Sequence, residues 1–117
     1  MTIETEVLTM IYSIEELKNL VKPIMDKYGI KRVYLFGSYA RGQATEDSDI
    51  DLLVDLSGSE IAKHMRDFGN VLEDLTVALQ KSVDLITLQS LEENKRLNRR
   101  KFFIQEVERE RRELLIA

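Results

Sequence analysis

The chain has 117 residues, of which 44% are hydrophobic and 32% are charged, and its formal net charge at pH 7 is −4. This length fits one domain with an adequate core and no second lobe. The absence of cysteine excludes disulfides and thiolate metal sites and suits a cytoplasmic location. No apolar run approaches the ~18 residues of a membrane span, and the acidic N-terminus does not resemble a signal peptide. The negative charge argues against direct nucleic-acid binding by the whole surface.

The first clear element is a helix that begins after Ser13. Residues 1–12 carry no strong pattern and Met10 offers a second start, so we expect a loose N-terminal arm followed by a single domain over residues 13–117. Ser13 and Glu16 have the spacing of a capping box, and apolar residues recur at helical spacing until Gly29. We interpret this helix as scaffold.

The most informative stretch is residues 35–55. An apolar run ends at Gly37 and Ser38, a charged segment follows, and a second apolar run carries Asp49 and Asp51 at alternate positions. This order predicts a strand, a tight turn, a short helix and a second strand. Period-two geometry places Asp49 and Asp51 on one face of that second strand, with Cα atoms roughly 6.6 Å apart.

The two carboxylates predicted to share this face need a cation. At ~4 Å they would repel by about 4 kcal/mol at an effective dielectric near 20. Oxygen ligands without a nearby His or Cys favour Mg²⁺ or Mn²⁺ over zinc. Gly37 would let the backbone approach a ligand closely, and the Ser38 hydroxyl with the amides of the next helix would donate to phosphate oxygens. These features predict a nucleoside triphosphate site; the alternative is a polar β-hairpin with a solvated acidic face.

A turn at residues 57–59 leads into a long predicted helix, residues 60–80, whose single apolar stripe would pack on the sheet or, at one end, against a partner subunit. His64, the one histidine, is expected to face solvent. Residues 82–87 predict a third strand, parallel to the second because the helix is long enough for a crossover. Asp84 interrupts this apolar strand, and a buried acid there would require a partner or a metal.

The C-terminal region is predicted to be helical. Ser90 and Glu93 have capping-box spacing, and the alternating Glu and Arg residues between 106 and 113 suggest intrahelical ion pairs. A basic cluster in this region permits three interpretations: a solvated helix face, a surface for an anionic partner or an RNA-facing patch. Its members are Lys95, Arg96, Arg99, Arg100 and Lys101.

The stretch GSYARG at residues 37–42, followed by SDIDLLV at residues 48–54, closely resembles the signature of the DNA polymerase β-like nucleotidyltransferase superfamily. More narrowly, it is similar to the minimal nucleotidyltransferases (MNT) that accompany HEPN-domain toxins. The resemblance extends from the first helix to at least Thr87. It implies the nucleotidyltransferase fold, an α/β (α+β) domain with a small mixed three-stranded sheet flanked by about four helices.

The resemblance also implies roles for individual residues. Gly37 and Ser38 would hold the triphosphate, and a triad of acids would bind divalent metal. Arg41 would contribute charge to the nucleotide or pair with Glu46 or Asp47. The implied metal ligands and catalytic acids are Asp49, Asp51 and Asp84.

By this resemblance, the chain is expected to be a Mg²⁺-dependent nucleotidyltransferase with a two-metal mechanism and the antitoxin of a type VII-like toxin–antitoxin pair. It would transfer AMP from ATP to a HEPN ribonuclease toxin, onto a tyrosine hydroxyl, and thereby silence the toxin. One alternative is an antitoxin that neutralises the toxin by binding and occlusion alone, and another is a small-molecule nucleotidyltransferase. The intact set of three acids favours the enzyme that modifies a protein.

Overall fold

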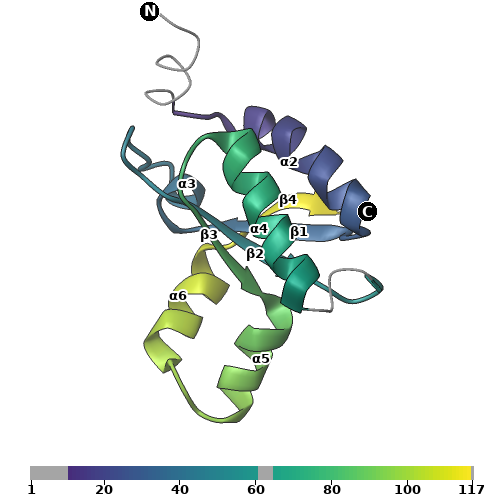
Figure 1. Cartoon of the computed structure of the whole chain (residues 1–117). Coiled ribbons are helices and arrows are strands. Elements are labelled where there is room, and N and C mark those ends of the chain that lie inside the picture. Colours follow the sequence, from purple (N-terminus) through teal and green to yellow (C-terminus); the bar gives the residue numbers. More distant parts are fainter. Residues whose placement is uncertain (1–10, 61–64, 117) are drawn as a thin grey trace, which may run out of the picture.

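The computed structural model describes residues 11–60 and 65–116, and its elements are labelled as in Figure 1. Residues 1–10 of the expected arm, which was predicted over residues 1–12, and His64 lie outside these residues. Within the described part of the chain there are five helices and four strands. In chain order these are α2 (Ile14–Tyr28), β1 (Arg32–Phe36), α3 (Gly37–Arg41), β2 (Ile50–Asp55), α4 (Met65–Leu79), β3 (Val83–Thr87), α5 (Leu88–Arg96), α6 (Lys101–Glu110) and β4 (Arg112–Ile116).

The strands form one mixed sheet in the order β3-β2-β1-β4. β1 runs antiparallel to both of its neighbours, and β2 and β3 are parallel. The predicted mixed fold class, the strand–helix–strand centre and the parallel third strand are therefore confirmed. No helix in the described part of the chain is both long and apolar enough to cross a membrane.

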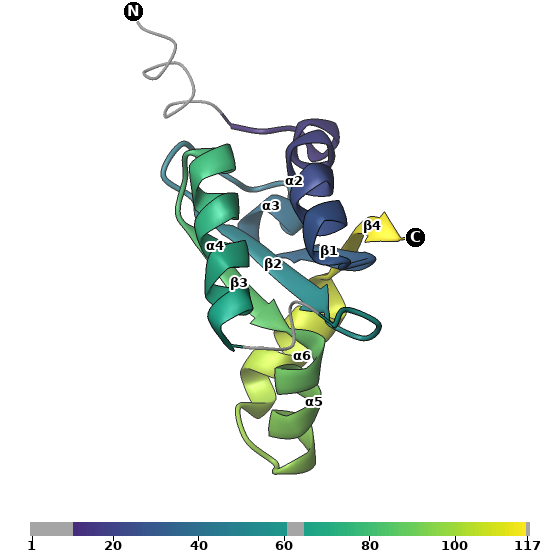
Figure 2. The ribbon, with the colours of Figure 1, turned by 45° about the vertical axis from the view of Figure 1, so that its right-hand side comes forward.

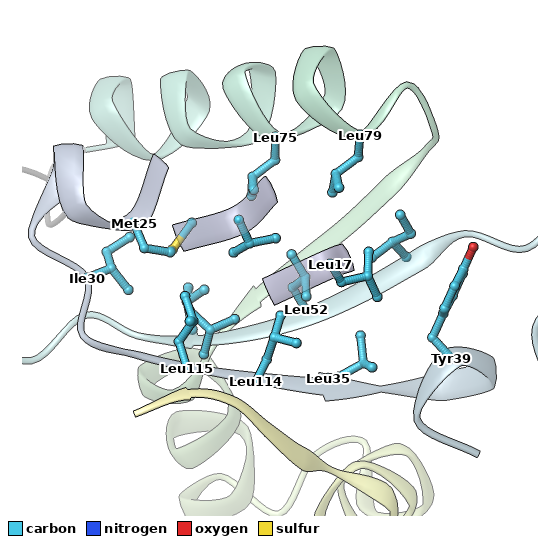
Figure 3. Close-up of a cluster of buried hydrophobic side chains, with 14 of the residues drawn as sticks. Leu17, Met25, Ile30, Leu35, Tyr39, Leu52, Leu75, Leu79, Leu114 and Leu115 are labelled. Carbon is cyan, nitrogen blue, oxygen red and sulfur yellow. The ribbon is translucent and has the colours of Figure 1, made fainter. Parts of the chain in front are cut away.

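The two faces of the sheet are covered by different helices (Figures 1 and 2). Alternation along β2 sends Ile50, Leu52 and Val54 into the main core, where they pack with side chains of α2 and α4 (Figure 3). Leu53 points to the opposite face and joins a smaller cluster with residues of α5 and α6. Asp51 shares that second face, because it lies two residues before Leu53.

α2 forms where the sequence predicts it. The side chain of Ser13 accepts a hydrogen bond from the Glu16 backbone while Glu16 bonds back, and Gly29 ends the helix in the left-handed conformation. Tyr12, the last residue of the predicted arm, is buried and donates its hydroxyl to the Leu79 carbonyl at 2.7 Å. The chain is therefore fixed to the core one residue before the helix cap.

The C-terminal region differs from the prediction. α5 begins at Leu88, and its cap is Thr87, whose side chain accepts from the Ser90 backbone, so the predicted capping box at Ser90 is wrong. Asn98 and Arg100 have left-handed φ values of 59° and 52°, which separates α5 from α6. Residues 112–116 form a strand rather than a helix, because they pair with the distant strand β1. The sheet thus has a fourth strand that local pattern did not predict.

Candidate active site

The start of β2 brings the predicted site residues together. Asp51 lies opposite Phe36 on β1 and opposite Asp84 on β3, and neighbouring strands are ~4.8 Å apart. Asp49 precedes the first residue of β2 and falls on the face of Asp51 by strand alternation. Gly37 follows Phe36 directly, which places it beside Asp51 as well. Three acids and a glycine from three separate elements therefore surround one point on the second face of the sheet.

Gly37 is in close contact with Asp51. Its φ is +71°, and a Cβ added there would lie 2.9 Å from the carboxyl carbon of Asp51 and overlap the Oδ2 atom. Only glycine meets both conditions without strain. The predicted close approach of the Gly37 backbone is thus an approach to the carboxylate of Asp51.

Ser38 opens the short helix α3 next to this contact. It is half-buried, and its hydroxyl makes no hydrogen bond to another described residue. The first turn of α3 also lacks a side-chain cap. A donor hydroxyl and free backbone amides therefore lie beside the acids.

Asp51 is the partly buried acid of the site, and its pKa is shifted. Burial, followed by the charges of Asp84 and Asp49, raises the pKa of Asp51 to about 6, and Arg41 opposes this shift. No described residue donates a hydrogen bond to its carboxylate. Its negative charge is unsatisfied within the described chain, and a cation is the group that would satisfy it.

The three carboxylates surround the site without forming a closed cage. Asp49 and Asp84 are exposed, and no group of three His, Cys, Asp or Glu within residues 11–60 and 65–116 has metal-holding geometry. Mg²⁺ keeps several waters and is usually held by one or two carboxylates together with substrate phosphates. An open all-oxygen donor set beside a hydroxyl and free amides fits Mg²⁺ bound together with a nucleotide.

Arg41 has a partner that the sequence analysis missed. Its Nη1 donates to both carboxylate oxygens of Glu110 at 3.0 and 3.1 Å, and its Nε donates to Gln43. The pairs proposed from sequence, with Glu46 or Asp47, do not form. Glu110 ends α6 and only 10% of its side chain is exposed. Its proximity to the site depends on tertiary structure, and the only available signal was an arginine without a local partner.

Asp55, at the far end of β2, shows what a satisfied acid in this strand looks like. Its Oδ1 accepts from the Ser57 backbone at 2.9 Å, from the Ser57 hydroxyl at 2.6 Å and from the Gln89 amide at 2.9 Å. Burial acts to raise the pKa of Asp55, but these bonds hold it below its ordinary value. Through its bonds to Ser57, Asp55 fixes the loop after β2, and it is not part of the acid site.

Comparison with known proteins identifies the family. Residues 15–114 match the model of the nucleotidyltransferase domain. The chain belongs to this nucleotidyltransferase family. The protein adenylyltransferase MntA of Thermococcus cleftensis is 36% identical over 83 residues, which cover 68% of this chain and 81% of MntA. MJ0435 of Methanocaldococcus jannaschii, provisionally named a protein adenylyltransferase, is 39% identical over 79 residues, or 68% of this chain and 82% of its own.

Solved structures share the fold of this nucleotidyltransferase. A toxin–antitoxin complex with AMP-PNP contains a chain with a TM-score of 0.63 and 24% identity, covering 86% of this chain and 73% of the other. A complex of a tri-AMPylated Shewanella oneidensis HEPN toxin with its MNT antitoxin gives a TM-score of 0.59 and 21% identity, covering 89% and 73%. The predicted family, fold and enzyme class are confirmed.

Proposed function

We propose that this nucleotidyltransferase transfers AMP from ATP to a tyrosine hydroxyl of a HEPN-domain toxin and thereby silences that ribonuclease. The observation that carries the proposal is the environment of Asp51: a partly buried carboxylate without hydrogen-bond donors, in contact with Gly37 and opposite Asp84. A charge kept unsatisfied costs stability, so its retention suits a ligand that brings positive charge. The similarity to MntA, named a protein adenylyltransferase, supports a protein as acceptor.

Each residue of the site has a role in this proposal. Asp49, Asp51 and Asp84 would hold Mg²⁺, which when bound polarises phosphate oxygens and stabilises the leaving pyrophosphate. Ser38 would donate to an oxygen of the β or γ phosphate, and Gly37 would leave room for the triphosphate. The hydroxyl oxygen of the acceptor would bond to the α phosphorus as the bond to pyrophosphate breaks. Asp84, exposed at the edge strand, is placed to take the proton of that hydroxyl.

The exposure of the site favours a macromolecular acceptor. Asp49 and Asp84 face solvent, and Asp51 lies on the face of the sheet whose Leu53 packs with residues of α5 and α6. A small acceptor would need walls on several sides to be held in line with the phosphate. A folded protein can supply those contacts itself.

Transfer of label tests the proposal directly. The purified chain is incubated with the HEPN protein, Mg²⁺ and ATP labelled on either the α or the γ phosphate. We expect the α label on the HEPN protein and the γ label in pyrophosphate. The toxin should stay inert after separation under denaturing conditions and refolding.

An Asp49→Asn/Asp51→Asn double variant separates transfer from binding. It should still bind the HEPN protein but lose both labelling and the protection of growing cells. Occlusion of the toxin by binding alone is the second candidate function, because the helical hairpin formed by α5 and α6 exposes an apolar side chain, Phe102. Full protection by the double variant, with recovery of ribonuclease activity after refolding, would replace transfer by occlusion.

A further inference from the structure

The hairpin formed by α5 and α6 projects from the sheet on the side away from α2 and α4 (Figures 1 and 2). Its end exposes the ring of Phe102, of which 85% is accessible to solvent. Five exposed cationic side chains lie between the end of α5 and this residue in the chain. We name this surface the basic tip; it comprises Lys95, Arg96, Arg99, Arg100, Lys101 and Phe102.

Positive charge on the basic tip is only partly neutralised. Lys95 pairs with Glu108 at 3.2 Å and Arg96 with Glu93 at 2.6 Å. Arg99 and Lys101 form no ion pair with any acid of the described chain. They also line an open cavity of about 250 Å³ whose lining includes Ile104. Unpaired positive charge therefore lies next to an exposed aromatic ring.

The basic tip is held in a defined conformation. Asn98 and Arg100 adopt left-handed backbone angles, which are unfavourable for residues other than glycine. The Arg100 guanidinium stacks on the Phe103 ring at 4.0 Å, and Phe103 meets Phe36 of β1 edge to face at 6.1 Å. A surface fixed in this way loses little entropy on binding.

α6 links the basic tip to the acid site. It begins beside Phe102 and ends at Glu110, which binds Arg41 next to Asp51. Eight residues at ~1.5 Å per residue give roughly 12 Å between these two points along the helix. A protein interface of standard size covers about 800 Å² on each partner and is wider than that distance. A protein whose hydroxyl reaches the acids can therefore contact the basic tip in the same interface.

We propose that the basic tip is the docking surface for the protein substrate, and that it binds an acidic patch surrounding an apolar pocket that receives Phe102. This inference rests on the proposed function. The chemistry favours a protein over RNA, because single strands are bound on successive stacking rings. Phe102 is the one ring left free at the basic tip, since Phe103 is covered by Arg100 and packs on Phe36. Arg99 and Lys101 would pair with the acidic rim.

Two surface variants and two matched controls test this inference. Phe102→Ala removes the exposed ring, and the double variant Arg99→Glu/Lys101→Glu reverses the unpaired charge. Val77→Ala removes an apolar side chain that is 65% exposed on α4, and Lys18→Glu reverses a charge on α2. None of these residues belongs to the acid site. Circular dichroism melts confirm folding of each variant before binding is compared.

The measurements are the Kd for the HEPN protein, the KM for that protein, and the Kd for a non-hydrolysable ATP analogue. We expect Phe102→Ala and the charge-reversal variant each to weaken HEPN binding and raise its KM at least tenfold, with nucleotide affinity unchanged. Both controls should match the wild type. Added salt should weaken binding of the wild type more than binding of the charge-reversal variant.

Three results would overturn the inference. Wild-type affinity in both variants, together with normal AMP transfer, would remove the basic tip from docking and leave the proposed function intact. Failure of the wild type to label the HEPN protein would overturn the proposed function and this inference together. Binding of a single-stranded RNA oligonucleotide that Phe102→Ala abolishes, without loss of HEPN affinity, would assign the basic tip to nucleic acid.

Discussion

Asp51 and Asp55 lie on the same face of β2, four residues apart, and neither is freely exposed, yet their environments are opposite. Asp55 accepts three hydrogen bonds from Ser57 and Gln89, which hold its pKa below the ordinary value. Asp51 accepts none from the described chain, has Asp84 opposite it in the neighbouring strand, and has a pKa raised to about 6. The fold supplies hydrogen-bond donors to Asp55 and supplies none to Asp51 within the described chain.

The two acids show two different environments for a carboxylate within one strand. A desolvated carboxylate stabilises the fold only when donors replace its lost water, and β2 supplies them at one end only. At the other end Asp51 contacts a glycine without a side chain, and the charges of two further acids outweigh the opposing charge of Arg41. Substitution of a satisfied polar group should therefore cost stability, and substitution of an unsatisfied one should not.

Asp51→Asn should lower the rate of transfer without lowering stability, whereas Asp55→Asn should lower stability and largely keep transfer. We expect Asp51→Asn to lower the rate of AMP transfer by about 10³-fold or more, because it removes charge that would hold Mg²⁺, while the metal-free protein becomes no less stable. Asp55→Asn should keep transfer within a few-fold of the wild type but lower the free energy of unfolding by about 1–3 kcal/mol, because it replaces the charged acceptor of three hydrogen bonds with a neutral amide oxygen. Transfer rates at saturating Mg²⁺ and urea unfolding measure the two effects. Equal loss of transfer in both variants would contradict the comparison.

Two glycines with the same backbone conformation test the contact with Asp51. Gly37 and Gly42 both have φ of +71°, but a Cβ at Gly42 would meet nothing within 4 Å. Each change to Ala should cost about 1 kcal/mol of backbone strain. Only Gly37→Ala should also displace the Asp51 carboxylate, and we expect transfer to fall by about 10²-fold. Similar kinetics in the two variants would show that the contact has no catalytic role.

Stability should depend on pH in opposite ways at the two ends of β2. Because the folded-state pKa of Asp51 is raised to about 6, its contribution to stability is present at low pH and is lost as pH rises through 6. Between pH 5 and pH 7 the metal-free wild type should lose roughly 0.5–1 kcal/mol relative to Asp51→Asn, allowing for solvent screening of the partly exposed group. The folded-state pKa of Asp55 is lowered. Its contribution to stability is therefore present above the ordinary carboxyl pKa and is lost as pH falls below that value.

Chemical denaturation across this pH range, with and without Mg²⁺, measures the difference. Added Mg²⁺ should remove most of the loss in the wild type, because it stabilises the ionised form of Asp51. No pH-dependent difference between the wild type and Asp51→Asn would show that the Asp51 charge is already satisfied.

The smallest effect concerns two buried tyrosine hydroxyls. Tyr12 donates to the Leu79 carbonyl, whereas the hydroxyl of Tyr39, at one end of the core cluster in Figure 3, has no hydrogen-bond partner among the described residues. We expect Tyr12→Phe to cost about 1 kcal/mol and Tyr39→Phe to be neutral or slightly stabilising. Thermal melts of the two variants measure this, and an equal loss in both would reveal an unrecognised partner for Tyr39.

The central part of the fold was predictable because its signals are local. A glycine and a serine after an apolar run, followed by alternating acids, specify a strand, a turn and a second strand whose faces are fixed by period two. The parallel third strand followed from one further step, a helix long enough for a crossover, whereas the grouping of Asp84 with the other two acids was implied by the family resemblance. These steps were sufficient to assemble the acid site.

The C-terminal region was not predictable because its decisive contacts are distant in sequence. The sequence of residues 112–116 resembles the end of a charged helix, but in the structure these residues pair with β1 as a strand. The break between α5 and α6 occurs at Asn98 and Arg100, without the glycine or proline that usually marks such a turn. The partner of Arg41 is Glu110, 69 residues away. Each of these features is decided by tertiary packing.

The intact mass of the HEPN protein after co-expression shows whether AMP has been transferred to it. Three co-expressions are compared, with the wild type, Asp51→Asn and Asp55→Asn. We predict that the HEPN protein gains the mass of one or more adenylyl groups with the wild type and with Asp55→Asn, and none with Asp51→Asn. An unmodified HEPN protein with the wild type, or a modified one with Asp51→Asn, would contradict the assignment of this acid site to AMP transfer.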